Sequence, residues 1–150
     1  MKKVLMVCLG NICRSPLAEG ILKSKINTEA VFVDSAGTAA YHVGNLPDVR
    51  SIEIAKNYGI NITKQRARKF TEKDFDAFDV IYAMDDSNYN NIISLARNKA
   101  DSQKVKLILN ESNPDKNLSV PDPYYGGKSG FENVYKMLDE ACSIVAGNLS

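Results

Sequence analysis

The stretch VLMVCLGNICRSPLAEG, residues 4–20, combines an apolar run, a loop that contains a glycine and the start of a helix. The run of residues 4–7 is typical of a strand buried in a sheet. Ser15 and Pro16 match the N-cap and first-turn proline of a helix that we expect to continue to about Ile26. A strand, a loop and a helix in immediate succession indicate an α/β fold.

The rest of the chain continues this alternation of strands and helices. Short apolar runs that indicate strands lie at residues 30–33, 80–84 and 105–109. Apolar residues at three- and four-residue spacing indicate helices at residues 48–58, 87–96 and 131–145. Gly59 is the expected stop of the first of these helices, and Ser87 is the expected cap of the second. We therefore predict one α/β domain over residues 1–150, in which helices flank both faces of a four-stranded parallel sheet.

The ligand site of such a fold is expected at one edge of the sheet. In open parallel sheets, ligands bind beyond the carboxyl ends of the strands, where the strand order reverses. Three segments leave strands at this edge: residues 8–15, Asp85 with Asp86, and the long loop after the fourth strand. We expect the functional residues to gather there, with a phosphate-binding loop between the first strand and the first helix.

The composition excludes several classes of function. The chain has 150 residues, with 19 Lys and Arg against 18 Asp and Glu, so its formal net charge is +1. This balance gives no global field for attracting nucleic acid or a membrane, and we expect neither as a partner. The first apolar run is too short for a secretory core or a membrane span, so we expect a cytoplasmic protein.

Cys8, Cys13 and Cys142 are odd in number and too few for a disulfide scaffold. We therefore expect free thiols in a reducing compartment. Cys142 lies on the apolar stripe of the last helix, so we expect it in the core. His42 is the single histidine, and no cysteine or carboxylate spacing offers it partners for a metal site. We predict neither a metal nor another cofactor.

The loop after the first strand has the features of an anion site. Its backbone N–H groups can point inward, and the N-terminus of the next helix adds partial positive charge. Arg14 can hold two phosphate oxygens in a fork that lysine cannot reproduce. The same field and the Ser15 hydroxyl would stabilise a thiolate at Cys8, a nucleophile aimed at phosphorus. The residues expected to bind phosphate are Leu9, Gly10, Asn11, Ile12, Cys13, Arg14 and Ser15.

This loop resembles the signature loop of the low molecular weight protein tyrosine phosphatases, a cytosolic α/β family. Further matches follow in the same order over essentially the whole chain, at residues 34–38 (DSAGT), 44–50 (GNLPDVR), 75–79 (FDAFD), 84–88 (MDDSN) and 122–126 (DPYYG). The resemblance implies that Cys8 attacks the phosphate and becomes a cysteinyl-phosphate, while Arg14 binds the phosphoryl oxygens. It also implies that Asp122 protonates the departing phenolate and then activates water. Pro121 and Pro123 restrict the backbone around Asp122, which suits a positioned acid and base.

The resemblance also implies roles at the rim of the site. Tyr41 matches an aromatic position at the mouth, and Tyr124 would face it, so that two rings hold a flat aryl phosphate. Cys13 matches a cysteine that can form a reversible disulfide with the nucleophile and so protect it from over-oxidation. Tyr124 and Tyr125 resemble a pair that kinases modify in some members.

Several residues are expected to support the loop. Asn11 is expected to hold it by hydrogen bonds, as its family counterpart does. Asp85 and Asp86 either contact the loop or its arginine, or form an ordinary acidic turn before a helix. Gln65 stands where many members have a histidine that supports the loop, and this departure puts the supporting network in doubt. The basic residues 64–69 are expected to be solvated, or to attract acidic residues beside a phosphotyrosine.

We predict a phosphatase of phosphotyrosine proteins, monomeric by default for the family, whose site also takes inorganic phosphate or other oxyanions. One alternative is an arsenate reductase of the same fold, but residues 83–96 lack the two further cysteines that its disulfide relay requires. The other is a phosphotyrosine reader without turnover, which the presence of Cys8, Arg14 and Asp122 disfavours. Hydrolysis of aryl phosphates that is lost in Cys8→Ser would distinguish the enzyme from the reader.

Overall fold

The computed structural model describes residues 1–123 and 126–149. Its four strands are β1 (Lys2–Cys8), β2 (Val31–Gly37), β3 (Val80–Ala83) and β4 (Val105–Leu107). They form one parallel sheet in the order β2-β1-β3-β4, and Cys8 pairs with Gly37 where β1 and β2 end. The predicted four-stranded parallel sheet is confirmed.

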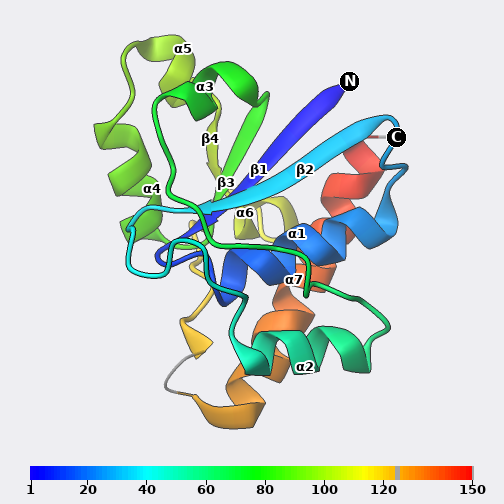
Figure 1. The fold of residues 1–150 in the computed structure, drawn as a ribbon. Coiled ribbons are helices and arrows are strands. Elements are labelled where there is room, and N and C mark those ends of the chain that lie inside the picture. Colours follow the sequence, from blue (N-terminus) through cyan, green and yellow to red (C-terminus); the bar gives the residue numbers. More distant parts are fainter. Residues whose placement is uncertain (124–125, 150) are drawn as a thin grey trace.

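Helices cover both faces of the sheet (Figure 1). The described helices are α1 (Arg14–Lys25), α2 (Val49–Asn57), α3 (Lys73–Ala77), α4 (Asp86–Ser94), α5 (Lys99–Gln103), α6 (Leu109–Ser112) and α7 (Gly127–Leu149). On one face α1, α2 and α7 pack against one another, while α3 and α4 contribute Phe75 and Ile92 to the core on the other. The predicted flanking of both faces is therefore confirmed.

The central strand β1 is apolar on both faces because both faces are covered. Successive side chains of a strand point to opposite sides. Val4 and Met6 belong to the core beneath α1 and α7, whereas Leu5 and Val7 belong to the core beneath α3 and α4. Each fully buried side chain of this kind contributes about 1.5–3 kcal/mol to folding. The continuous apolar run in the sequence thus reflects a strand with no solvated face.

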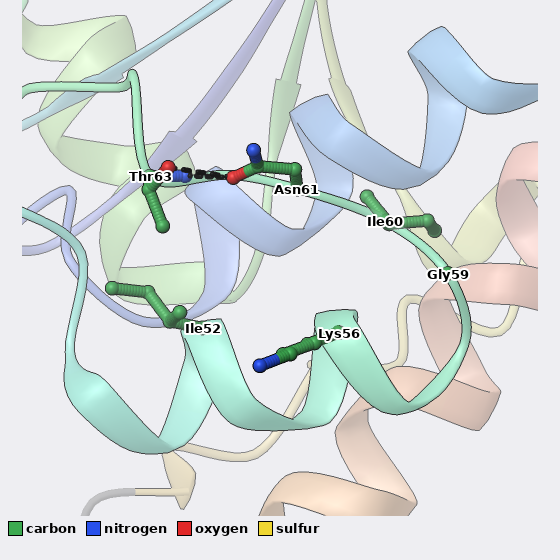
Figure 2. Close-up of a pocket in the computed structure, with 6 residues that line it drawn as sticks. All are labelled: Ile52, Lys56, Gly59, Ile60, Asn61 and Thr63. Atoms are coloured by element: carbon green, nitrogen blue, oxygen red, sulfur yellow. Dashed lines mark hydrogen bonds between the residues drawn. The ribbon is translucent and has the colours of Figure 1, made fainter.

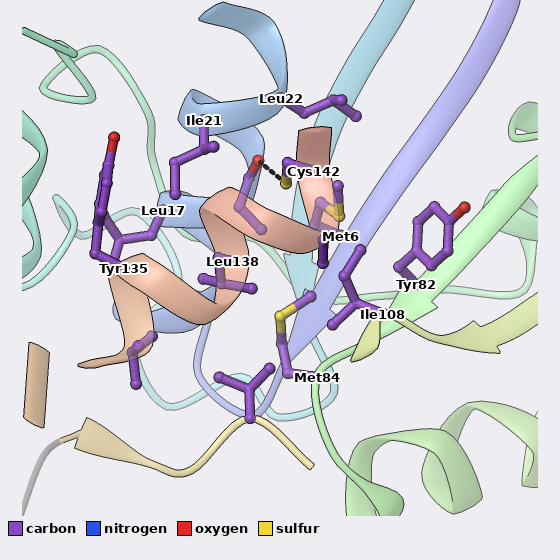
Figure 3. Close-up of a cluster of buried hydrophobic side chains, with 14 of the residues drawn as sticks. Met6, Leu17, Ile21, Leu22, Tyr82, Met84, Ile108, Tyr135, Leu138 and Cys142 are labelled. Atoms are coloured by element: carbon purple, nitrogen blue, oxygen red, sulfur yellow. Dashed lines mark hydrogen bonds between the residues drawn. The ribbon is translucent and has the colours of Figure 1, made fainter. Parts of the chain in front are cut away.

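The long helix α7 supplies much of the core on the α1 face. Figure 3 shows Leu138 and Cys142 of α7 facing Leu17 and Ile21 of α1, with Met6 of the sheet beside them. The expected apolar stripe and the core position of Cys142 are confirmed, although the helix extends beyond residues 131–145 at both ends. No helix in the described part of the chain is long and apolar enough to cross a membrane.

Two predicted helix caps are wrong. Helix α1 begins at Arg14, so Ser15 lies inside its first turn, and the Ser15 hydroxyl contacts Cys8 instead of capping the helix. Helix α4 begins at Asp86, and the carboxylate of Asp85 accepts the N–H of Asn88 at 2.7 Å, the bond expected of Ser87. In α4 the Asp85 carboxylate takes the capping position, whereas α1 begins after Cys13 without a side-chain cap.

Strand boundaries also differ from the prediction. Strand β2 runs to Gly37, four residues past the apolar run, because Asp34, Ser35 and Ala36 also pair with β1. Strand β4 ends at Leu107, and α6 follows almost at once. The extension of β2 is what brings the DSAGT segment beside the loop that follows β1.

Candidate active site

The loop after β1 lies at the carboxyl edge of the sheet, as predicted. It crosses directly over the end of β2, where the backbone N–H groups of Thr38 and Ala39 donate to the carbonyls of Cys8 and Leu9, both at 2.9 Å. A Cβ added to Gly37 would lie 2.7 Å from the Leu9 carbonyl oxygen. Only glycine permits this approach, which explains its place in the DSAGT segment.

A cavity of about 280 Å³ opens above this loop. Its walls come from the loop, from the segment after β2 and from the segment before α7. The lining residues are Cys8, Leu9, Gly10, Ile12, Cys13, Arg14, Tyr41, His42 and Asp122. Residues far apart in the sequence are thereby brought around one space, with Cys8 and Arg14 among its lining residues.

Cys8 is held in contact with the first turn of α1. Its Sγ atom lies 3.0 Å from the Ser15 hydroxyl oxygen, and both side chains are buried within the protein. A thiolate in this position would have a hydroxyl donor and the N-terminal end of a helix beside it. These are the surroundings that favour a reactive cysteine.

Arg14 is fixed by groups from two other segments. Its Nη1 donates to Asp85 Oδ2 at 2.6 Å and to the Val120 carbonyl at 2.9 Å. The side chain is 4% exposed yet lines the cavity. Of the two acidic residues considered after β3, Asp85 therefore holds the arginine, whereas Asp86 begins α4 and its N–H donates to Ser119. The bonds to Asp85 and Val120 orient the Arg14 guanidinium before any anion arrives.

Asn11 and Ser15 lie behind the loop, where both side chains are buried. The Nδ2 group of Asn11 donates to Ser15 at 2.8 Å and to Ser35 at 3.0 Å, and Asn11 Oδ1 accepts the backbone N–H of Arg68 at 3.0 Å. Its φ of +58° lies in the left-handed region, which asparagine tolerates better than most residues. The expectation that Asn11 holds the loop by hydrogen bonds is confirmed.

The two cysteines that line the cavity differ in their surroundings. Burial, followed by the negative charge of Asp48, raises the pKa of the Cys13 thiol to about 12. Cys13 therefore remains a protonated thiol at neutral pH. Its backbone is fixed, since the Cys13 carbonyl accepts the Ser51 hydroxyl at 3.2 Å.

The rim of the cavity carries aromatic and acidic groups. Tyr41 is 76% exposed, and Asp122 is also exposed, between Pro121 and the buried Pro123. His42, for which the sequence predicted no role in metal binding, lies against Gly10 and lines the same cavity. The predicted partner of Tyr41, Tyr124, lies outside the described residues, as does Tyr125.

Gln65, the residue whose support of the loop was in doubt, contacts the helix that follows the loop. Its Nε2 donates to the Pro16 carbonyl in the first turn of α1 at 3.1 Å. In the neighbouring basic stretch, Lys64, Arg66 and Lys69 are exposed as expected. The expectation that this basic stretch is solvated is wrong for Arg68.

Arg68 is half-buried because two carboxylates hold it. Its guanidinium pairs with Asp34 at 3.1 Å and with Asp74 at 3.0 Å. Burial by itself would lower the pKa of the Arg68 guanidinium, but Asp74 and Asp34 together raise it. The backbone N–H of Arg68 also donates to Asn11 Oδ1. Charge alone suggested a solvated face for residues 64–69, and no local pattern distinguishes Arg68 from its exposed neighbours.

A second cavity, of about 490 Å³, lies between α2 and the segment that follows it (Figure 2). Its lining residues are Ile52, Lys56, Gly59, Ile60, Asn61 and Thr63. They include no thiol or carboxylate, and Asn61 and Thr63 hydrogen-bond to each other. In the described parts of the chain, no cluster of three or more His, Cys, Asp or Glu could hold a metal ion. Of these two cavities, only the one above the loop after β1 has thiols and a carboxylate among its lining residues.

Comparison with known proteins agrees with this geometry. The family model described as "Low molecular weight phosphotyrosine protein phosphatase" matches residues 3–150. A protein of that name from Schizosaccharomyces pombe is 46% identical over 141 residues, which cover 91% of this chain and 89% of the relative.

Two solved structures are similar in fold and sequence. The protein tyrosine phosphatase from Entamoeba histolytica, with Hepes in its active site, has a TM-score of 0.92 and 38% identity, covering 99% of this chain and 97% of that one. A Drosophila structure named arginine phosphatase has a TM-score of 0.89 and 34% identity, with the same coverage of both chains. The chain thus belongs to the low molecular weight phosphotyrosine protein phosphatases, a family of phosphoric monoester hydrolases.

Proposed function

We propose that this phosphatase hydrolyses phosphotyrosine through a cysteinyl-phosphate intermediate. The observation that carries the proposal is that Asp122 lines one cavity with Cys8 and Arg14, although it lies far along the chain from the loop that carries them. These residues are a nucleophile, an oxyanion ligand and a proton donor, the three groups that phosphate ester cleavage through a covalent intermediate requires.

In the first step, the Cys8 thiolate attacks phosphorus opposite the phenolic oxygen. The S–P bond forms as the P–O bond to the tyrosine breaks, and the electron pair of that bond goes to the phenolic oxygen. Asp122, present as the carboxylic acid, donates its proton to this oxygen, so the product leaves as neutral tyrosine. The exposed position of Asp122 at the rim suits a group that meets the leaving side chain.

In the second step, water attacks the cysteinyl-phosphate. Asp122, now a carboxylate, accepts a proton from the water as the O–P bond forms and the S–P bond breaks. The electron pair of the S–P bond returns to Cys8 as thiolate, and inorganic phosphate leaves. No cofactor enters either step, because nucleophile, acid and base are all side chains of the chain.

Arg14 would bind the phosphoryl oxygens in both steps. The guanidinium is planar and delocalised, so it can hold two equatorial oxygens as charge moves onto them in the transition state. Its bonds to Asp85 and Val120 hold that plane in place before substrate arrives. The Leu9–Cys13 backbone and the N-terminal end of α1 would complete the phosphate site.

The substrate side of the proposal rests on the shape of the cavity mouth. Tyr41 stands there, on the segment after β2, and an aromatic ring favours the flat face of a phosphotyrosine side chain. Phosphotyrosine proteins would be the natural partners, since a protein substrate can present such a side chain to a cavity of this size.

Cys13 would protect the nucleophile from oxidation. A peroxide oxidises the Cys8 thiolate to a sulfenic acid, and hydroxide leaves and becomes water. Attack by the Cys13 sulfur then forms a disulfide and releases a second water. The negative charge of Cys8 is one cause of the raised Cys13 pKa, so its loss on oxidation makes Cys13 a better attacking thiol.

The test compares wild type, Cys8→Ser and Asp122→Ala on p-nitrophenyl phosphate, a phosphotyrosine peptide and a phosphoarginine peptide. We expect Cys8→Ser to lose about 10⁴-fold or more in kcat. Asp122→Ala should slow the phosphotyrosine peptide by about 10²–10⁴-fold. It should slow p-nitrophenyl phosphate less, because that leaving group needs less protonation.

Asp139→Ala is the matched control, because Asp139 lies on α7 and pairs with Lys25 at the surface. It should leave all three rates unchanged. Turnover by Cys8→Ser would contradict the covalent mechanism. Faster hydrolysis of the phosphoarginine peptide than of the phosphotyrosine peptide would contradict the assigned substrate class, and would place the chain with the Drosophila relative.

A further inference from the structure

The segment that carries Asp122 is held on its two sides by different parts of the molecule. Before Asp122, the Val120 N–H donates at 2.7 Å to the carbonyl that follows β3, and the Val120 carbonyl accepts Arg14 at 2.9 Å. After Asp122, the buried Pro123 lies against the first turn of α7, where a Cβ added to Gly130 would be 3.5 Å from the Pro123 carbonyl oxygen. The position of Asp122 therefore depends on where the first turn of α7 is held.

Two backbone hydrogen bonds join Pro123 to this first turn. The Gly126 N–H donates to the Pro123 carbonyl at 3.0 Å, and the Gly130 N–H donates to the Gly126 carbonyl at 3.2 Å. The packing is close as well, since a Cβ added to Gly126 would lie 3.2 Å from the Cα of Gly130. A displacement of the first turn of α7 would therefore move Pro123, and with it the neighbouring Asp122.

Phe131, the residue after Gly130, connects the start of α7 to α2. Its side chain is buried, and Arg50 of α2 lies over its ring, with the Arg50 Cζ atom 4.7 Å from the ring centroid. A guanidinium within about 6 Å of a ring centroid is attracted by the negative face of the ring. Helices α2 and α7 pack against each other (Figure 1), and this contact joins the start of one helix to the start of the other.

Asp48 in turn holds the guanidinium of Arg50. The Nε and Nη2 groups of Arg50 donate to the two carboxylate oxygens of Asp48, both at 3.1 Å. Burial by itself would raise the pKa of the Asp48 carboxyl, but its bonds to Arg50 lower it, so the pair is charged at neutral pH. The Asp48 N–H donates to the Ile12 carbonyl at 2.7 Å. The guanidinium thus lies between a residue bonded to the phosphate-binding loop and the helix start that carries Pro123.

Capping of α2 would not by itself require an arginine at position 50. Asp48 caps the helix through the backbone N–H of Arg50 at 2.8 Å, and every residue except proline can supply that group. The Arg50 side chain is 38% exposed, and exposed ion pairs contribute little to stability. Arg50 is also not among the described residues that line the cavity above the loop after β1. Neither capping nor contact with substrate therefore accounts for a guanidinium that extends to Phe131.

We propose that Arg50 is a positioning residue, whose guanidinium joins the start of α2 to the start of α7 and thereby holds Asp122 over the cavity. The proposal rests on the assigned role of Asp122 as general acid. A general acid has to lie within hydrogen-bond reach of the leaving oxygen, and a displacement of about 1 Å can cost about 10²-fold in rate. After burial, the charges that change the pKa of the Cys13 thiol include those of Asp48, Asp122 and Arg50, so these three groups lie near the same wall of the cavity.

The experiment measures kcat/KM for phenyl phosphate and for p-nitrophenyl phosphate in wild type, Arg50→Met and Arg50→Lys. Phenolate is the poorer leaving group and depends more on the proton from Asp122. We therefore expect Arg50→Met to lower kcat/KM about tenfold for phenyl phosphate and less than about twofold for p-nitrophenyl phosphate. Arg50→Lys keeps the charge without the planar fork, so it should show most of the same loss.

A double-mutant cycle separates positioning of the acid from a general loss of structure. In the Asp122→Ala background, Arg50→Met should cost nothing further on phenyl phosphate, because no acid is left to be positioned. A loss that persists without Asp122, wild-type rates in a folded Arg50→Met, or complete recovery in Arg50→Lys would each overturn the proposal. If Arg50→Met fails to fold, Phe131→Leu removes the ring at the other end of the contact and must give the same dependence on the leaving group.

Arg97→Met is the matched control, because Arg97 is an arginine in similar surroundings. It pairs with Asp76 at 2.7 Å and with Asp101 at 2.8 Å, and its Cζ atom lies 5.9 Å from the centroid of the Phe75 ring. Phe75 belongs to the core on the face of the sheet opposite α2 and α7. Arg97→Met should therefore leave kcat/KM unchanged for both substrates.

The single variant Asp122→Ala distinguishes failure of this inference from failure of the proposed function. If Asp122→Ala hydrolyses phenyl phosphate as fast as wild type, the assigned acid is wrong, and the role of Arg50 is refuted with it. If Asp122→Ala is slow while Arg50→Met is as fast as wild type, only the role of Arg50 is refuted.

Discussion

Cys8 and Cys142 are both cysteines of one core cluster, but they lie in two different regions of it, and α1 contacts both. At the start of α1, Ser15 lies 3.0 Å from Cys8, and one turn later the Ala18 carbonyl accepts the Cys142 thiol at 3.7 Å. Both cysteines are almost fully buried. Yet Cys8 lines a cavity with an arginine and a carboxylate, whereas Cys142 is surrounded by apolar side chains (Figure 3).

The difference predicts that two equally buried cysteines will react at different rates, because their surroundings differ. Burial among apolar side chains raises the pKa of the Cys142 thiol to about 12, and the attraction of Lys25 offsets only part of this rise. The loop around Cys8 offers a hydroxyl, a helix N-terminus and Arg14 in the same small space. We therefore expect reactivity to depend on the polar loop, and stability to depend on the packed helices beside it.

The largest expected effect is the difference in alkylation rate between the two thiols. At pH 7 a thiol with a pKa of about 12 is ionised in about one molecule in 10⁵, and each pH unit upward raises that fraction tenfold. We expect iodoacetamide to modify Cys8 at least about 10³-fold faster than Cys142 in the folded protein. Mass spectrometry of both peptides over time measures this ratio.

Unfolding in guanidinium should remove the difference, which controls for intrinsic reactivity. Inorganic phosphate should slow the reaction of Cys8 alone, because it would occupy the site. Comparable rates in the folded protein would show that the loop confers no special reactivity on Cys8.

A smaller effect is expected from Cys142→Ser, which should affect stability and leave catalysis unchanged. A hydroxyl is costlier to bury among apolar side chains than a thiol, and at 3.7 Å the Ala18 carbonyl suits sulfur rather than oxygen. We expect a loss of about 1–3 kcal/mol in the free energy of unfolding. Chemical denaturation measures the loss, and kcat at a temperature where the variant is folded should remain within about twofold of wild type.

Ser143→Ala, which alters an exposed hydroxyl on the same helix, is the matched control and should change neither quantity. A fall in kcat for folded Cys142→Ser would mean that the two regions are coupled through α1. The two regions would then have to be treated as a single cooperative unit.

The smallest effect concerns oxidation, in which we expect Cys8 to pair with Cys13 while Cys142 does not react. After mild peroxide treatment, we expect a disulfide between Cys8 and Cys13 and an unmodified Cys142. A reductant should restore wild-type activity, whereas Cys13→Ser should recover several-fold less because Cys8 proceeds to the sulfinic acid. Recovered activity and peptide masses are the measurements.

Cys142→Ser should recover as fully as wild type, which serves as the control. Sulfinic acid at Cys8 in the wild type, without the Cys8–Cys13 bond, would rule out the protective role of Cys13.

The sequence by itself determined the order of elements and the location of the chemistry. Apolar runs such as residues 4–7 are typical of strands buried on both faces, and a glycine-containing loop before a helix start is typical of an anion site. The loop of residues 8–15, with Cys8 and Arg14, was readable because local spacing carries the information. Three short helices, α3, α5 and α6, were not predicted, since four or five residues are too few for a helical period.

Only the tertiary structure decided which distant residues support that loop. Asp85 rather than Asp86 holds Arg14, Arg68 is built into ion pairs, and Glu19 reaches the loop through Ser35. Each of these depends on the register of β2 and β3 against β1, which no local pattern encodes. A charged side chain looks the same in a sequence whether it is solvated or paired. The fold determines its partner, and only the bonds to that partner offset the free energy cost of burying the charge.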